Sequence, residues 1–213
     1  MNYGIPVADR FNIGQNYGNV EGTRRHRMLL TAMYQLPFGA GRTWMNRGGW
    51  KDVVLGGWDL TNVTLLQTGP WQTPSISAAA DQSNTNVANR GAVIRPDMVS
   101  KDFYAGQSRA QYFNLAAFAP TPVGAGRFGN AGVGILQGPG TAAVSLGVAK
   151  VFPITERVHA RFESTFTNLL NHTNFAPPAT VVDSPSTFGA LIGPQTAENA
   201  GNRTGQLALR VDF

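Results

Sequence analysis

The chain ends in the stretch Gly205-Gln206-Leu207-Ala208-Leu209-Arg210-Val211-Asp212-Phe213, which decides the fold. Apolar residues alternate there with small or polar ones, which is the period of a β-strand with one apolar face. Soluble proteins seldom end inside such a strand, because termini fray. A tilted strand of roughly 9 to 11 residues crosses a bilayer. The stretch therefore predicts the last strand of a transmembrane β-barrel, with the last strand of a soluble β-sandwich as the alternative.

The same alternation predicts four earlier strands, at residues 25–36, 55–68, 141–152 and 158–167. It is clearest in the last of these, where Val158, Phe162 and Phe166 share one parity. It is weakest at 55–68, where Leu60 falls on one parity and Val63 on the other. A β-bulge would reconcile the two halves of that strand.

Two connections are long, polar and rich in Gly and Pro, at residues 69–140 and from 168 to about 203. Irregular stretches of this length are uncommon in compact soluble domains, whereas large barrels carry long loops on their outer side. We therefore expect an all-β fold, an antiparallel transmembrane β-barrel of which about five C-terminal strands are present, with long outer loops. Residues 1–24 are expected to be the remnant of an outer loop and 25–213 the C-terminal portion of the barrel.

Composition excludes several classes of protein. The 213 residues include 25 Gly and 13 Pro with 14% charged residues, which favours many turns and an all-β class. The net charge is +5, but no contiguous basic stripe occurs, so a nucleic-acid partner is not expected. The absence of cysteine excludes disulfides and thiolate metal sites. No apolar run reaches the roughly 18 residues of a transmembrane helix.

Charged residues indicate which face of the wall would look into the lumen. A lipid-facing arginine near the bilayer centre costs roughly 2 to 4 kcal/mol. We therefore predict these lumen-facing side chains: Lys150, His159, Arg161, Glu163 and Arg210. They would contact a solute or a plug, or pair with one another inside the wall, and we prefer the mutual pairing.

Large aromatic residues gather near the predicted strand ends. Amphipathic rings are enriched at membrane interfaces. A small aromatic core beneath a turn is the alternative interpretation. The predicted interface aromatics are Tyr34, Phe38, Trp44, Trp50, Trp58 and Phe152.

A set of short motifs, in order along nearly the whole chain, resembles the C-terminal barrel of TonB-dependent outer-membrane receptors of the Oar-like type. The motifs are Arg25-His26-Arg27, Leu36-Pro37-Phe38-Gly39-Ala40-Gly41-Arg42, Gly56-Gly57-Trp58, Thr68-Gly69, Tyr112-Phe113-Asn114, Arg127-Phe128-Gly129-Asn130, Gly138-Pro139-Gly140, Asn168-Leu169-Leu170-Asn171-His172, Phe188-Gly189 and Gln206-Leu207-Ala208-Leu209-Arg210. The resemblance implies a plugged barrel of about 22 strands that imports a large or scarce ligand across the outer membrane of a Gram-negative bacterium.

The resemblance also implies partners. This chain would be a fragment, with the N-terminal barrel strands, the plug and a targeting segment encoded upstream. The plug would connect the barrel to the TonB energy-coupling complex, and outer-membrane lipid would surround the wall. The barrel-assembly machinery would recognise an assembly signal formed by Leu207, Leu209, Val211 and Phe213. The sequence does not identify the ligand.

The sequence shows no strong pattern that is typical of a catalytic or metal site. His26, His159 and His172 lie on different segments, so no metal site is expected. No Gly-x-Ser-x-Gly motif occurs, and we expect neither an enzyme, nor catalytic residues, nor a cofactor. Asn168, Asn171 and Asn174 recur at every third position, which favours asparagines that close a turn over a ligand-binding loop. The rival function is a soluble secreted β-sandwich that binds carbohydrate or protein through its loops.

Overall fold

The structure, a computed structural model, describes residues 8–39, 41–45 and 49–213. The chain divides into two compact units. The sheet unit comprises His26–Gln67, Thr141–Asn174 and Pro194–Phe213. The loop unit comprises Met1–Arg25, Thr68–Gly140 and Phe175–Gly193. The two units group the long connections 68–140 and 175–193 with the N-terminal segment. The division into an outer-loop remnant at 1–24 and a barrel portion at 25–213 stays a prediction.

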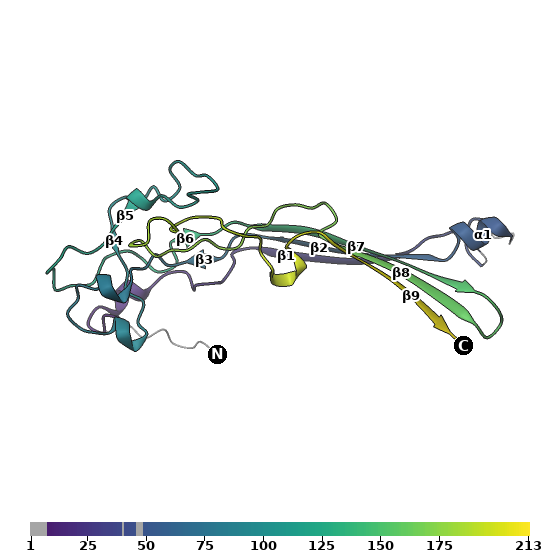
Figure 1. Cartoon of the computed structure of the whole chain (residues 1–213), viewed down its shortest axis with the longest axis horizontal. Helices are drawn as coiled ribbons and strands as arrows, with labels where there is room; N and C mark the ends of the chain where they lie inside the picture. Colours follow the sequence, from purple (N-terminus) through teal and green to yellow (C-terminus); the bar gives the residue numbers. More distant parts are fainter. Residues whose placement is uncertain (1–7, 40, 46–48) are drawn as a thin grey trace. The chain divides into compact units, whose positions relative to one another are not determined.

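The sheet unit is one open antiparallel sheet of five strands, in the order β1-β2-β7-β8-β9, and Figure 1 shows these strands running side by side. All five strands predicted from the alternation are present, with bounds that differ by at most a few residues. The strands are β1 (Arg27–Gln35), β2 (Trp58–Gln67), β7 (Thr141–Pro153), β8 (His159–Thr167) and β9 (Thr204–Asp212). The predicted all-β antiparallel fold is therefore confirmed, although the sheet is not closed into a barrel.

Strand β2 contains no bulge. Its pairing with β1 runs without interruption from Arg27 opposite Gln67 to Gln35 opposite Asp59. Its pairing with β7 is equally continuous. The bulge that would reconcile the two halves of this strand is therefore absent, and Val63 lies on the opposite face of the sheet from Leu60.

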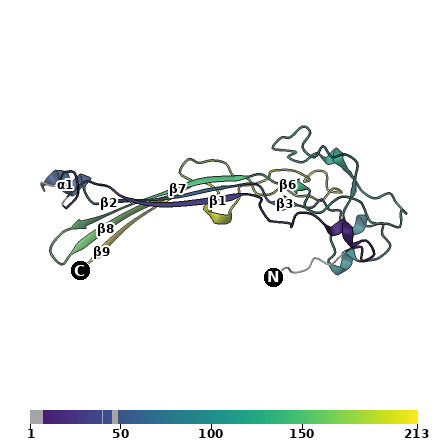
Figure 2. The same ribbon diagram turned by 180° about the vertical axis from the view of Figure 1, so that it is seen from behind.

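One end of the sheet, the turn end, carries two connections. The turn after β7 is tight, because Ile154 and Thr155 both donate backbone N–H groups to the carbonyl oxygen of Val158, at 2.9 and 3.1 Å. The connection from β1 to β2 is longer and contains the helix α1 (Trp50–Leu55), which the sequence patterns did not predict. Helix α1 and the C-terminal end of β9 lie at this same end of the sheet (Figure 2). The other end of the sheet, where β2 ends and β7 begins, is the long-connection end.

The loop unit has little regular structure but is compact. The elements of the loop unit are η1 (Ile13–Asn16), β3 (Trp71–Gln72), η2 (Ala78–Ala80), η3 (Ala88–Arg90), β4 (Asp97–Met98), η4 (Leu115–Ala117), β5 (Phe118–Ala119) and β6 (Leu136–Gln137). Strand β3 pairs with β6, and β4 pairs with β5, each over two residues. A further 3-10 turn, η5 (Ala197–Asn199), belongs to the sheet unit.

The loop unit contains its own apolar core, which corrects the expectation of an irregular polar loop. Rings of Phe113 and Phe118 both contact Phe188, at centroid distances of 6.3 and 6.0 Å. Gly189 has φ +72°, and a Cβ atom there would lie 2.8 Å from the backbone nitrogen of Phe113, so this position requires glycine. The buried core residues are Ile76, Ala92, Ile94, Phe113, Ala117, Phe118, Ala131, Leu136, Val182 and Phe188.

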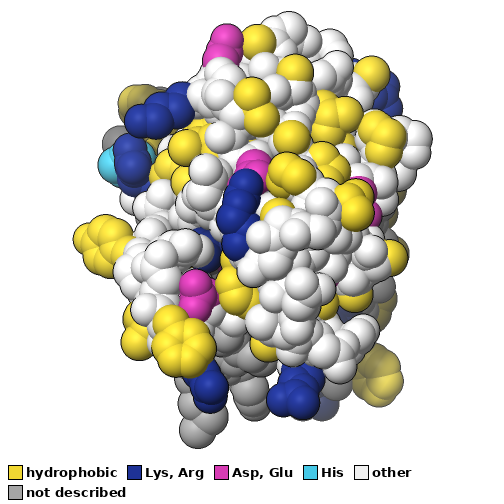
Figure 3. All heavy atoms as spheres, turned by 90° about the vertical axis from the view of Figure 1, so that its left-hand side faces the viewer, with side chains coloured by type: hydrophobic (Ala, Val, Ile, Leu, Met, Phe, Trp, Pro, Cys, Tyr) yellow, Lys and Arg dark blue, Asp and Glu magenta, His cyan; other side chains and the backbone are white. Residues whose placement is uncertain are grey.

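On the face of the protein shown in Figure 3, apolar side chains lie between polar and charged ones.

In the loop unit Arg127 donates two hydrogen bonds to Asp97, each of 2.7 Å, one to each carboxylate oxygen. These bonds to Arg127 hold the pKa of Asp97 below its usual value, although partial burial opposes the shift.

Of the helices in the described residues, none has the length and apolar character required to cross a membrane.

Candidate functional site

The register of the sheet separates its side chains into a polar face and an apolar face, because directly paired residues in an antiparallel sheet point to the same side. The polar face holds cross-strand rows such as Thr61-Gly147-Thr165-Gln206 and Asp59-Ala149-Glu163-Ala208. The apolar face holds rows such as Tyr34-Leu60-Val148 and Phe152-Ala160-Val211. The alternation predicted for β9 is therefore present, with Leu207, Leu209 and Val211 on the apolar face.

Four of the five predicted lumen-facing residues share the polar face. Arg161 Nε pairs with Glu163 Oε1 at 2.5 Å, and Arg210 Nε pairs with Asp212 Oδ1 at 2.7 Å. His159 stands directly opposite Asp212. Arg161 stands opposite Arg210, a like-charge juxtaposition that each guanidinium offsets with its own carboxylate. Arg161 and Glu163 therefore pair with each other, whereas Arg210 pairs with Asp212, which is outside the predicted set. That these side chains face a lumen stays a prediction.

Lys150 differs from the other four, because the register places it on the apolar face between Trp58 and Phe162. Only 3% of the residue is exposed. Its Nζ donates to the carbonyl oxygen of Val54 at 3.2 Å and to that of Gly56, next to the C-terminal end of α1. The ammonium also lies 5.3 Å from the Trp58 ring centroid and 5.0 Å from that of Phe152. These contacts stabilise a charge on a face whose other strand residues are apolar or uncharged, such as Asn62 and Ser164.

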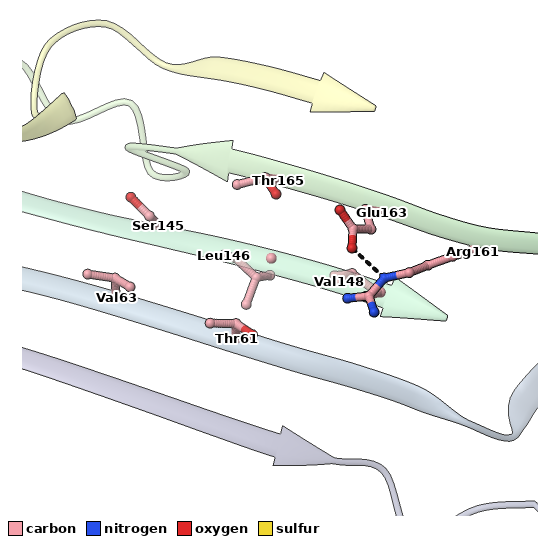
Figure 4. A pocket seen from close by; sticks show the side chains of 10 residues that line it. Thr61, Val63, Ser145, Leu146, Val148, Arg161, Glu163 and Thr165 are labelled. Atoms are coloured by element: carbon pink, nitrogen blue, oxygen red, sulfur yellow. Dashed lines mark hydrogen bonds and ion pairs between the residues drawn. The ribbon is translucent and has the colours of Figure 1, made fainter. Parts of the chain in front are cut away.

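A hollow of about 260 Å³ interrupts the polar face at Gly147. It forms because glycine contributes no side chain between Thr61 on β2 and Thr165 on β8 (Figure 4). A Cβ atom at Gly147 would meet Thr61 at an ordinary contact distance of 3.6 Å, so the hollow is not required by backbone crowding. The Arg161–Glu163 pair lies at its turn end (Figure 4). The hydroxyl groups of Thr61 and Thr165 and the Arg161–Glu163 ion pair line the hollow, so it is suited to a polar ligand.

A short segment after Pro194 lies against the polar face at the long-connection end. Glu198 pairs with Arg27 at 2.7 Å and accepts a hydrogen bond of 3.1 Å from Gln67 Nε2. Thr141 donates to Gln195 Oε1 at 2.9 Å. The sequence did not predict this contact. Glu198 has φ +58° and lies outside the strands, where no periodic pattern of apolar residues indicates its position.

Two of the recurring asparagines, Asn168 and Asn174, form a buried corner beside this segment, whereas Asn171 is exposed. Asn174 is completely buried, and its side chain accepts from the Ala142 N–H at 2.8 Å and donates to Ala142 O at 3.0 Å and Ala200 O at 2.8 Å. Asn168 donates to His172 O at 2.8 Å. Asn168 and Asn171 have positive φ, a conformation that asparagine tolerates. This geometry is that of a turn closed by side chains, the preferred interpretation.

The predicted interface aromatics gather at the turn end of the sheet unit. Tyr34, Trp58 and Phe152 lie on the apolar face, near the ends of their strands. Phe38 contacts Trp44 with ring centroids 5.5 Å apart. Trp44 and Trp50 are exposed, so these rings do not form the small aromatic core that was the alternative. Their role at a membrane interface stays a prediction.

No metal centre is evident in the part of the chain that the structure describes, where no three His, Asp or Glu side chains gather at a possible ion site. Within the same residues, no strand pairs with the outer edge of β1 or of β9, and both strands are exposed along their length.

An open antiparallel sheet with an exposed apolar face, a face of paired charges and two unpaired edges has the features of a section of the wall of a membrane β-barrel. Comparison with known families agrees, because the family model described as outer membrane beta barrel domain matches residues 2–206. The chain belongs to this outer membrane beta barrel family and is located in the outer membrane. Neither the curated proteins nor the solved structures include a match to the chain.

Proposed function

We propose that the protein forms part of the wall and the outer loops of a TonB-dependent transporter that imports a large or scarce ligand. The charged face of the sheet carries this proposal. Two ion pairs and the hollow at Gly147 share one face, while the opposite face is apolar. Such a face suits a polar lumen that is filled by water or by a plug.

The unpaired edges support further strands as partners. Edge strands with free N–H and C=O groups promote aggregation unless another strand or element covers them, and in a bilayer they are costlier still. In the proposed assembly, N-terminal barrel strands pair with these edges and a plug contacts the polar face. The TonB energy-coupling complex acts through that plug.

The assembly signal is part of the same proposal. Leu207, Leu209 and Val211 present an apolar row on an edge strand, and Phe213 follows the strand with its side chain fully exposed. The barrel-assembly machinery recognises this row and captures the edge before it aggregates. The protein acts as a wall and a ligand-binding surface and catalyses no reaction.

A soluble β-sandwich is not favoured. A sandwich buries the apolar face of one sheet against a second sheet about 10 Å away. In the sheet unit, the described residues form a single sheet, and Leu209 on its apolar face is 70% exposed.

Site-directed labelling tests the transport proposal, because the protein has no cysteine and each introduced thiol is unique. In cells that carry the protein in the outer membrane, we expect Thr165→Cys, beside the hollow, to react with a membrane-impermeant maleimide. The labelling rate should change when a protonophore collapses the proton gradient, because an energised plug moves against the polar face. Leu207→Cys on the apolar face should resist the same reagent.

The control is Val123→Cys in the loop unit, where the native side chain is 93% exposed. Its labelling should be fast and independent of energy. Labelling of Thr165→Cys that is identical with and without the proton gradient, and with and without TonB, would overturn the transport proposal. Equal labelling of Leu207→Cys and Thr165→Cys would instead contradict the assignment of the polar face to the lumen.

A further inference from the structure

A pair of hydrogen-bond donors on the polar face of the sheet, at the long-connection end, holds a carboxylate of the chain itself. Arg27 Nη1 lies 2.7 Å from Glu198 Oε1, and Gln67 Nε2 donates to Glu198 Oε2 at 3.1 Å. Arg27 on β1 and Gln67 on β2 are directly paired, so their side chains lie next to each other. Each donor thus contacts one of the two oxygens, an arrangement that suits a carboxylate.

The carboxylate belongs to a short tip, residues 196–199, which lies between two buried anchors. At the first anchor, Gln195 is 4% exposed and its N–H donates to Asn174 O at 2.8 Å. At the second, Ala200 is completely buried and its carbonyl oxygen accepts from Asn174 Nδ2, also at 2.8 Å. Glu198 has φ +58°, which is a strained conformation for glutamate. The anchors, and not the preference of its own backbone, therefore hold Glu198 against the sheet.

The contact of Glu198 with the two donors is accessible and only partly satisfied. The side chains of Arg27 and Glu198 are 49% and 35% exposed, so a solute can reach the ion pair, and water weakens it. Gln67 is only 7% exposed, yet its Oε1 has no hydrogen-bond partner in the described part of the chain. Glu198 therefore uses one end of this buried amide and leaves the other end available to a ligand.

We propose that Arg27 and Gln67 form a binding site for a carboxylate group of the imported ligand, and that Glu198 occupies this site until the ligand displaces it. The tethered Glu198 competes at an effective concentration in the millimolar range, so it sets a threshold that the ligand must exceed. This inference names the chemical class of the ligand and rests on the proposed function in one respect, namely that the polar face lines the lumen.

Acetate binding tests the proposal, with acetamide as an uncharged probe of the same shape. The full chain in detergent micelles is titrated at constant ionic strength while NMR follows the side-chain amide of Gln67. We expect acetate to shift this signal and acetamide to leave it unchanged. Glu198→Gln should lower the Kd for acetate by about tenfold, because the internal competitor loses its charge. Adding Arg27→Gln to that variant should reverse the gain, because the charged donor is lost.

The matched control is Asp212→Asn, which removes the same charge from another ion pair of the polar face and should leave the Kd unchanged. Glu198→Gly is a second test variant that relieves backbone strain, because glycine adopts φ +58° readily, and it should bind acetate at least as tightly as Glu198→Gln. Equal acetate affinity of the parent chain and both Glu198 variants would overturn the proposal, as would an equal response to acetamide. The titration involves neither a plug nor a proton gradient, so its failure is distinguishable from failure of the transport proposal.

Discussion

The two units of the protein differ in how far their apolar side chains are exposed. In the loop unit Phe113 and Leu136 are completely buried, within a core built from turns. In the sheet unit Leu207 and Leu209 are about 70% exposed along a regular strand. Burial of apolar surface is favourable in water, so the loop unit is suited to an aqueous surrounding. The sheet is suited to an apolar one, which is the bilayer.

The largest expected effect is in the loop unit. Phe113→Ala removes a fully buried ring that packs on Phe188, and such truncations cost about 3 to 5 kcal/mol. Hydrogen exchange should show faster opening of amides in the loop unit and unchanged protection in β7 and β8. Val123→Ala is the control, because an exposed side chain changes stability by less than about 0.5 kcal/mol. Equal loss of protection in both units would show that they do not unfold separately.

The next effect compares the two faces of β9. Leu209→Arg places a charge on the apolar face and should cost about 2 to 4 kcal/mol if the position lies near the bilayer centre. Ala208→Arg changes the neighbouring residue on the polar face and should cost far less. Urea titration of the protein folded in vesicles measures both. Similar costs would contradict the assignment of the two faces to lipid and lumen.

The smallest effect is a pH dependence confined to the loop unit. Hydrogen bonds from Arg127 lower the pKa of Asp97 in the folded protein. At Asp183 burial acts to raise the pKa, but the hydroxyl and the N–H of Ser77 lower it overall. A depressed carboxyl pKa contributes stability above the unfolded value, and that stability is lost as the pH falls through the folded value.

Limited proteolysis of the loop unit should therefore accelerate below the usual aspartate pKa, and Asp97→Asn should weaken the dependence. The effect is small because half of the Arg127 side chain is exposed. Proteolysis that is independent of pH over the acidic range would contradict this prediction.

Much of the sheet could be predicted from sequence because a period of two is a local pattern. All five strands follow it, including their approximate bounds. Lys150 was assigned to the wrong side because its charge was given more weight than its parity, which it shares with Val148 and Phe152. The signal that separates Lys150 from Arg161 was thus present in the sequence.

The loop core and the Glu198 contact could not be predicted in this way. Ile94, Phe113 and Phe188 come from distant turns without a shared period, so only the folded chain brings them together. The helix α1 is also too short for a periodic signal. These elements depend on tertiary packing, which pattern reasoning does not capture.

The asparagine corner has a consequence for how the protein tolerates change. The carbonyl oxygen of Asn174 accepts a hydrogen bond of 2.8 Å from the N–H of Gln195. This bond joins the two ends of the segment that lies between these residues. Loop closure costs rise only slowly with added length. A foreign sequence inserted beside Ile192, whose side chain is 75% exposed, therefore need not shift the register of β8 against β9. Insertion near Val182 or Phe188 would instead disrupt the core of the loop unit. The position at Ile192 is thus the part of this segment suited to grafting an epitope or a reporter peptide.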